Sequence, residues 1–149
     1  MRVQDLIDRA RRDAFRAARA MPEDRLRWRP LESGQSVLEI CRELAQTPDW
    51  AYWILTDAKP DDPELAAEEQ RAERKSWSTV EACETACRTK LERLFSLYRE
   101  LNEDQLAKTR WLPFNGGRDH TTLELLDYPR WDLVYHTGQI DLIRSLKIP

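Results

Sequence analysis

Apolar residues recur along this sequence at spacings of three and four, the period of a helix that buries one face. The clearest stripe consists of Val80, Cys83, Cys87, Leu91, Leu94, Tyr98 and Leu101. Another consists of Ile40, Glu43, Thr47, Trp50 and Ile54, with Leu44 and Ala51 widening it. A further amphipathic stretch is RWDLVYHTGQIDLIRSL, residues 130–146. The pattern predicts long amphipathic helices, with Glu43, Asp132 and His136 as polar interruptions of buried faces.

Three segments begin with a hydroxyl side chain followed three residues later by glutamate. Such a pair satisfies free backbone groups at a helix N-terminus. The pairs are Ser36–Glu39, Ser78–Glu81 and Thr121–Glu124. With an uncapped start at Val3, they predict four helices of roughly 18 to 25 residues. Connections are expected at PLESGQ, AKPDDPE and TRWLPFNGGRDH, the last with a turn at Asn115-Gly116.

Two prolines bear on the helix boundaries. Pro48 lacks a backbone donor, so the second helix either kinks there or restarts with Thr47 as its cap. Pro129 lies three residues before Asp132. If the last helix begins at Pro129, Asp132 is a carboxylate in a first turn, where the helix dipole favours it.

Composition agrees with a helical protein. The chain has 149 residues, 41% of them apolar and 34% charged, and only 4 glycines, which is typical of long helices and not of a turn-rich β-sandwich. The length suits one hydrophobic core. We therefore expect a single all-α domain over residues 1–149, arranged as a four-helix bundle.

The charge distribution gives no footprint for nucleic acid over the whole chain, because the net charge is -3. Residues 2–29 are rich in arginine, but acidic residues are interleaved with them, which favours a solvated helix face over nucleic-acid binding. Three cysteines without a CxxC pair, and no long apolar run, predict a reduced, cytoplasmic protein without a membrane span. Cys83 and Cys87 are expected to be small buried hydrophobes.

Asp132 and His136 are four residues apart, so their side chains share one helix face and are spaced to hold one cation. If Glu43 projects into the same space, the three supply carboxylate oxygens and an imidazole nitrogen to a divalent metal with open positions. Two simpler interpretations stay open. Asp132 and His136 form an ordinary ion pair, or Glu43 pairs with one of the many arginines.

The stretches MPEDRLRWRPLESGQSVLEICRELAQ and TTLELLDYPRWDLVYHTGQIDLIRSL resemble the DinB-like proteins, including the YfiT-like thiol transferases, over nearly the whole chain. The resemblance implies a four-helix bundle, often dimeric, that holds zinc or nickel through three histidines. It also implies transfer of a low-molecular-weight thiol to a small-molecule substrate. Carried onto this chain, the three ligand positions fall on Glu43, Asp132 and His136, of which only His136 keeps the family's residue.

The two carboxylates change the expected chemistry of such a site. Oxygen ligands shift the preference from zinc and nickel toward manganese, iron or magnesium, and the carboxylate charges make the bound metal less electrophilic. The first hypothesis is therefore a homodimeric metal-dependent enzyme that activates a thiol or water. The alternative is a metal-free bundle, in which protonated His136 lies between Glu43 and Asp132 and the fold serves small-molecule binding or dimerisation.

His120, in the loop before the last helix, is a candidate for a supporting acid–base role, although a solvated loop histidine is the simpler interpretation. The sequence contains no HExxH, GxSxG or phosphate-binding glycine loop, so it gives no support for a zincin, a serine hydrolase or a nucleotide-binding enzyme. Six tryptophans are expected to serve the core or a helix interface, with some lining a pocket.

Overall fold

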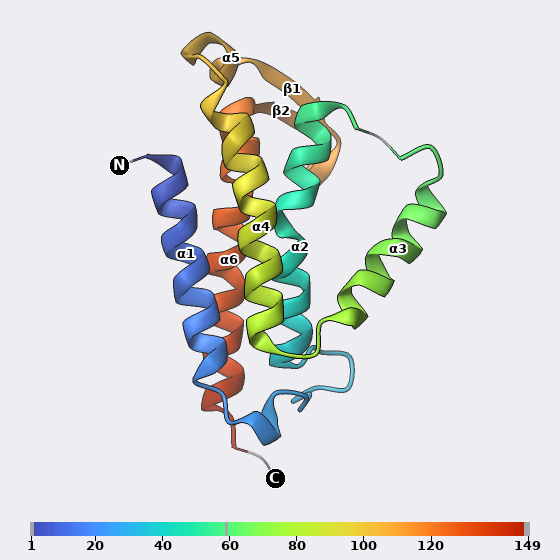
Figure 1. The fold of residues 1–149 in the computed structure, drawn as a ribbon, viewed down its shortest axis with the longest axis vertical. Coiled ribbons are helices and arrows are strands. Elements are labelled where there is room, and N and C mark those ends of the chain that lie inside the picture. The colour runs from blue at the N-terminus through green and yellow to red at the C-terminus, as the bar shows by residue number, and fades with distance from the viewer. Residues whose placement is uncertain (1, 59, 148–149) are drawn as a thin grey trace.

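A computed structural model describes residues 2–58 and 60–147; the ends of the expected domain range, residues 1 and 148–149, and residue 59 lie outside this part. The described chain is mostly helical, as the sequence predicts, with one small sheet. Four long helices run alongside one another (Figure 1). They are α1 (Val3–Arg19), α2 (Val37–Thr56), α4 (Val80–Arg99) and α6 (Thr122–Ser145). Within this group α2 and α6 are neighbours, and this contact positions the polar residues singled out above.

The remaining elements lie at the ends and side of the long helices (Figure 1). They are the helices α3 (Pro63–Ser76) and α5 (Glu103–Ala107), the strands β1 (Thr109–Leu112) and β2 (Arg118–Thr121), and 3-10 turns at Glu23–Arg25 and Phe114–Gly116. The strands pair antiparallel, with Arg110 opposite His120. Backbone φ angles of 52° at Asn115 and 89° at Gly116 close the hairpin and confirm the predicted turn.

Two of the predicted capping pairs are present. The Glu39 amide donates to Ser36 Oγ over 3.2 Å, and the Ser36 amide donates to Glu39 Oε2 over 2.8 Å. Thr121 and Glu124 make the same reciprocal bonds at the start of α6. The third prediction is wrong by one residue, because Thr79 Oγ1 accepts from the Ala82 amide and so caps α4 in place of Ser78. Ser78 and Thr79 are adjacent hydroxyl residues, and Thr79 has the extended backbone of an N-cap residue.

Both prolines lie inside continuous helices. The α2 helix runs through Pro48, so it does not restart with Thr47 as its cap. The α6 helix begins seven residues before Pro129, and Asp132 is therefore not in a first turn. Each proline removes its own backbone donor and crowds the carbonyl one turn earlier, and packing of the rest of the helix outweighs both effects.

The connections contain more structure than the sequence analysis predicted. The expected loop AKPDDPE ends early, because Asp62 Oδ1 accepts from the amides of Glu64 and Leu65 and starts α3 at Pro63. No residue described in α3 is buried, so this helix shows no apolar stripe. Similarly, the expected loop TRWLPFNGGRDH forms the β1–β2 hairpin, whose pairing depends on contacts between its two halves.

The core lies between the long helices and includes the three cysteines, each free and fully buried. The predicted burial of Cys83 and Cys87 is thus confirmed. Burial raises the pKa of Cys83 to about 11, and raises the pKa of Cys41 and Cys87 further. The thiols are therefore protonated at neutral pH and are not nucleophiles.

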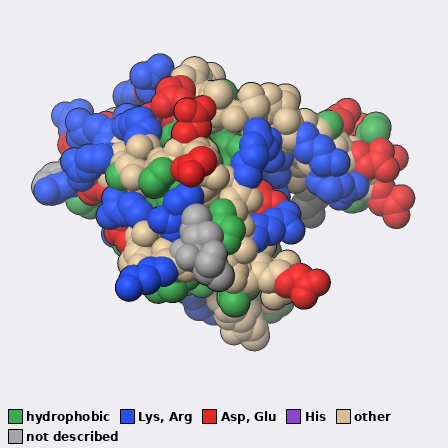
Figure 2. All heavy atoms as spheres, turned by 90° about the horizontal axis from the view of Figure 1, so that it is seen from below, with side chains coloured by type: hydrophobic (Ala, Val, Ile, Leu, Met, Phe, Trp, Pro, Cys, Tyr) green, Lys and Arg blue, Asp and Glu red, His purple; other side chains and the backbone are tan. Residues whose placement is uncertain are grey.

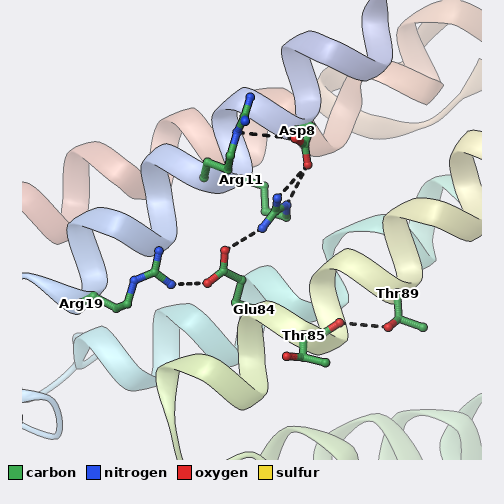
Figure 3. A network of polar contacts seen from close by, with 7 residues as sticks. Asp8, Arg11, Arg19, Glu84, Thr85 and Thr89 are labelled. Carbon is green, nitrogen blue, oxygen red and sulfur yellow. Dashed lines mark hydrogen bonds and ion pairs between the residues drawn. The ribbon is translucent and has the colours of Figure 1, made fainter.

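The arginines of α1 are held by carboxylates. Arg11, only 7% exposed, donates to Asp8 and, over 2.6 Å, to Glu84 Oε1 of α4. Arg19 pairs with the other oxygen of Glu84, so this one carboxylate joins two arginines of α1 to α4 (Figure 3). A buried arginine requires such partners, because an unpaired buried charge is strongly destabilising. These contacts account for part of the arginine-rich pattern.

None of the helices described in residues 2–58 and 60–147 is both long and apolar enough to cross a membrane.

Candidate functional site

A row of polar and aromatic side chains lies between α2 and α6. Thr47 on α2 faces Asp132 on α6, and Trp50, one turn further along α2, faces Tyr128. In the other direction, Glu43 lies opposite His136. These residues share faces because positions three and four apart in a helix are neighbours. We call this row the α2–α6 seam.

Asp132 is the centre of the seam. Only 8% of the residue is exposed, and both carboxylate oxygens have partners. Thr47 Oγ1 donates to Oδ2 over 2.5 Å, and Oδ1 lies 3.1 Å from Nδ1 of His136. The same nitrogen is 2.9 Å from the backbone carbonyl oxygen of Asp132. Together these contacts fix the orientation of the His136 ring and place Nδ1 toward Asp132.

The other ring nitrogen of His136 faces Glu43. Nε2 lies 3.9 Å from Glu43 Oε2, which also accepts a hydrogen bond from Gln35 Nε2 over 2.8 Å. The Glu43 side chain is 36% exposed, whereas that of His136 is 8% exposed. Because Nδ1 is occupied by Asp132, Nε2 is the ring nitrogen left for other groups, and the partly exposed Glu43 side chain lies on that side of the ring.

Charge and burial act in opposite directions on His136. Burial lowers its pKa, but the hydrogen bonds to the Asp132 carboxylate and carbonyl, with the charges of Asp132 and Glu43, outweigh burial and raise the pKa above its usual value. The protonated ring is thus favoured in the folded state. Its contribution to stability is complete below the unfolded-state pKa of about 6.5 and is lost as pH rises through the folded-state pKa.

The three expected metal ligands come together, but their donor atoms do not surround one point. Asp132 lies on the Nδ1 side of the imidazole and Glu43 on the Nε2 side. Within residues 2–58 and 60–147, no group of three His, Cys, Asp or Glu side chains is placed to hold one ion. The three residues therefore do not fit a shared metal in this arrangement. Asp132 instead occupies the place of a carboxylate that orients a histidine.

An aromatic pocket of about 640 Å³ adjoins the seam at the hairpin end. Its aromatic wall consists of Trp50, Phe114, Tyr128 and Trp131. The Trp50 and Tyr128 rings are 4.7 Å apart between centroids, and the Trp50 and Phe114 rings are 5.3 Å apart and edge-on. Burial raises the pKa of Tyr128, and the negative charges of Asp132 and Glu43 raise it further. The negative charges of the seam therefore also act on Tyr128 in the wall of the aromatic pocket.

The other sequence candidates fall beside the seam. His120 lies in β2 and lines the aromatic pocket, with Nδ1 3.1 Å from the Arg118 carbonyl oxygen. Its acid–base role stays a prediction. Phe114 and Tyr128 were not predicted from the sequence to be functional residues. Tyr128 had a usable signal, since it lies one turn before Asp132, whereas the position of Phe114 depends on the hairpin fold.

A second pocket, of about 710 Å³, lies at the opposite end of the seam between residues 28–35 and the end of α6. Gln35 and Gln139 line it, and they connect it to Glu43 and to the turn after His136. In the described part of the chain, Oε1 of Gln139 is buried without a hydrogen-bond partner. The seam thus has an aromatic pocket at one end and a largely apolar pocket at the other.

No family model matches the chain, and no curated protein matches it either.

The role of Asp132 leads to a prediction about His136. Replacing Asp132 with asparagine removes the negative charge at Nδ1, so the pKa of His136 should fall, as followed by NMR titration of the ring proton on Cε1. The loss of stability as pH rises above the unfolded-state pKa of about 6.5 should also become smaller. Asp127→Asn is the matched control on the same helix, because Asp127 pairs with Arg130. An unchanged His136 pKa in Asp132→Asn would contradict the assigned contact.

Proposed function

We propose that this chain is a four-helix bundle of the DinB-like type whose α2–α6 seam binds a small molecule without a resident metal. The observation that carries the proposal is the position of Asp132, which uses Nδ1 of His136 and the hydroxyl of Thr47 as its partners. A carboxylate paired in this way is satisfied without a cation. Protonated His136 lies between the two carboxylates, and its positive charge offsets part of their negative charge.

The aromatic pocket supplies the body of the binding site. Its rings favour a planar or apolar group, because aromatic faces and edges pack well against such surfaces. With His136 protonated, Glu43, Asp132 and His136 carry a net charge of about -1. The seam therefore disfavours an anionic polar end, and a donor from protonated His136 requires a neutral hydrogen-bond acceptor there. His136 lies outside the lining of the aromatic pocket, so a ligand bound there has to extend along the seam past Tyr128 before Nε2 of His136 can donate to its polar end.

A metal-dependent transferase is the second candidate function, and one observation favours it. Nε2 of His136 and Oε2 of Glu43 face each other across 3.9 Å, and the orienting carboxylate behind a histidine is a common feature of metal sites. In that case Glu43 and His136 would hold a divalent ion such as zinc, nickel, manganese or iron. Its open positions would activate a low-molecular-weight thiol or water.

Metal content and chelator response separate the two candidates. We expect tag-free protein to contain no stoichiometric metal by plasma mass spectrometry, and its melting temperature to be the same with chelator and with added zinc, nickel or manganese. The control variants are Glu43→Gln and His136→Asn. A melting temperature that metal raises in the wild type but not in these variants would favour the transferase and overturn the metal-free proposal.

Ligand binding in the aromatic pocket is testable with the neutral dye Nile red. We expect its fluorescence to rise on addition of the protein, and Phe114→Ser to weaken binding by roughly tenfold because one aromatic wall is lost. Leu65→Ser is the matched control, since Leu65 is a similarly exposed apolar residue, on α3. Equal binding by the wild type and both variants would place the dye elsewhere and count against the pocket.

We also propose that the protein is a homodimer that pairs through α6. The outward face of this helix carries the exposed apolar residues Trp131, Val134, Tyr135 and Leu142, and the exposed Leu146 follows directly after the helix. Gly138 lies in the middle of this stripe, and a Cβ placed there would meet no atom within 4 Å. A glycine inside a helix costs about 1 kcal/mol relative to alanine, and here it permits close approach of another helix. Two antiparallel copies would set Tyr135 opposite Leu142.

Sedimentation velocity tests the dimer. Leu142→Arg puts a charge in the proposed interface and should shift the protein from dimer to monomer, because burying an unpaired charge is unfavourable. Leu65→Arg makes the same change on α3 and should leave the dimer intact. A monomeric wild type at tens of micromolar, on the order of typical assay concentrations, would show the proposal to be wrong.

A further inference from the structure

A cluster of cations surrounds a small cavity at the end of the molecule opposite the hairpin. The cavity, of about 280 Å³, lies between the start of α2 and the last turns of α3. Its charged lining consists of Arg29, Arg42, Arg71, Arg74, Lys75 and Glu39. Figure 2 views this end from below and shows Lys and Arg side chains over much of this face, including a group on the right next to the acidic side chains at the outer edge. Five cations here face a single carboxylate in a chain whose net charge is -3.

The single acid does not neutralise the other cations. Arg29 Nε donates to Glu39 Oε2 over 3.0 Å, and the guanidinium also bonds the second oxygen, so these two residues form a closed pair. Glu39 additionally accepts from the Ser36 amide as part of the α2 cap. In residues 2–58 and 60–147, none of the other four cations forms an ion pair with a carboxylate. They are Arg42, Arg71, Arg74 and Lys75.

Two of the four are held in place by their Nε atoms. Arg42 Nε donates to the Trp77 carbonyl oxygen over 2.7 Å, and Arg74 Nε donates to the Gln46 side chain. Both guanidinium groups thus keep terminal NH2 groups with no hydrogen-bond acceptor in the described chain. Arginines fixed through Nε present the remaining donors in a defined direction, which suits planar or tetrahedral oxyanions.

The other two, Arg71 and Lys75, are exposed and lie four residues apart on α3. Like charges at this spacing destabilise a helix by roughly 0.2 to 0.5 kcal/mol, and Arg74 adds a third charge one turn away. The helix dipole does stabilise cations in the last turn of a helix. That effect accounts for Arg74 and Lys75 but not for Arg42, which comes from α2, or for Arg71, which lies earlier in α3.

We propose that this cavity binds a small polyanion, such as a phosphorylated or polycarboxylated molecule. The fixed guanidinium groups of Arg42 and Arg74 hold its oxygens, and Arg71 and Lys75 close over it from α3. Binding removes the repulsion among four cations from two helices. The site is separate from the α2–α6 seam, and the proposal does not depend on the function proposed there; Gln35, which lines the cavity and bonds Glu43, is the connection between them.

Isothermal titration calorimetry at low ionic strength tests the site, with pyrophosphate and citrate as probes. We expect one binding site per chain and an affinity that falls as salt is added. The double variant Arg71→Ala/Lys75→Ala should weaken binding by roughly tenfold or more. It should remain folded, because both side chains are exposed and make no hydrogen bond within the described residues. The preferred probe distinguishes a phosphate ligand from a carboxylate ligand.

Arg9→Ala/Arg88→Ala is the matched control. It removes two exposed cations that form no ion pair in the described part, one on α1 and one on α4, and so changes the net charge equally. Binding within about twofold of the wild type is expected for this control. The proposal is overturned if neither probe binds the wild type up to about 10 mM, or if both double variants lose affinity equally, which would indicate only general charge attraction.

Discussion

The hydrogen bond between Thr47 and Asp132 is the contact on which the interior of this protein depends. Asp132 is a carboxylate placed on the buried face of α6, where an unpaired charge would oppose folding. Thr47 satisfies one oxygen and His136 the other, so α2 and α6 are held in one relative position. The Trp50–Tyr128 contact on one side and the Glu43–His136 contact on the other follow from that register.

The sequence was sufficient to predict the parts of this arrangement that depend on helical periodicity. The stripe of α4 from Val80 to Leu94, the inward positions of Asp132 and His136, and the caps of α2 and α6 all follow from residues a few positions apart. At the end of the predicted stripe Tyr98 is half-buried, and Leu101 lies beyond the end of α4. Residue spacing along a helix does not determine which atoms of a side chain face which neighbour. It places Asp132 near His136, but only the folded packing decides that Nδ1 faces Asp132 and Nε2 faces Glu43.

The elements that were missed share a physical reason. The α3 helix buries no described residue, so hydrophobic periodicity carries no sign of it, and its attachment uses polar contacts such as Gln46 to the Gln70 carbonyl. The hairpin has strands of four residues each, too short for a clear alternating pattern. Its fold nevertheless determines where Phe114 and His120 lie relative to Trp50. Both connections therefore shape the pockets, although neither contributes to the main core.

The three cysteines have a practical consequence for studying this molecule in solution. Cys41, Cys83 and Cys87 are enclosed by the core, and their thiols stay protonated at neutral pH. Maleimide and nitroxide reagents act on accessible thiolates, so the natural chain offers them no ready target while it is folded. A single cysteine introduced on α3 or in the hairpin would be labelled selectively against this background. With a second cysteine introduced on the exposed face of a long helix, fluorescence or spin-label distances between these outer segments and the long helices are then measurable without removing a native cysteine.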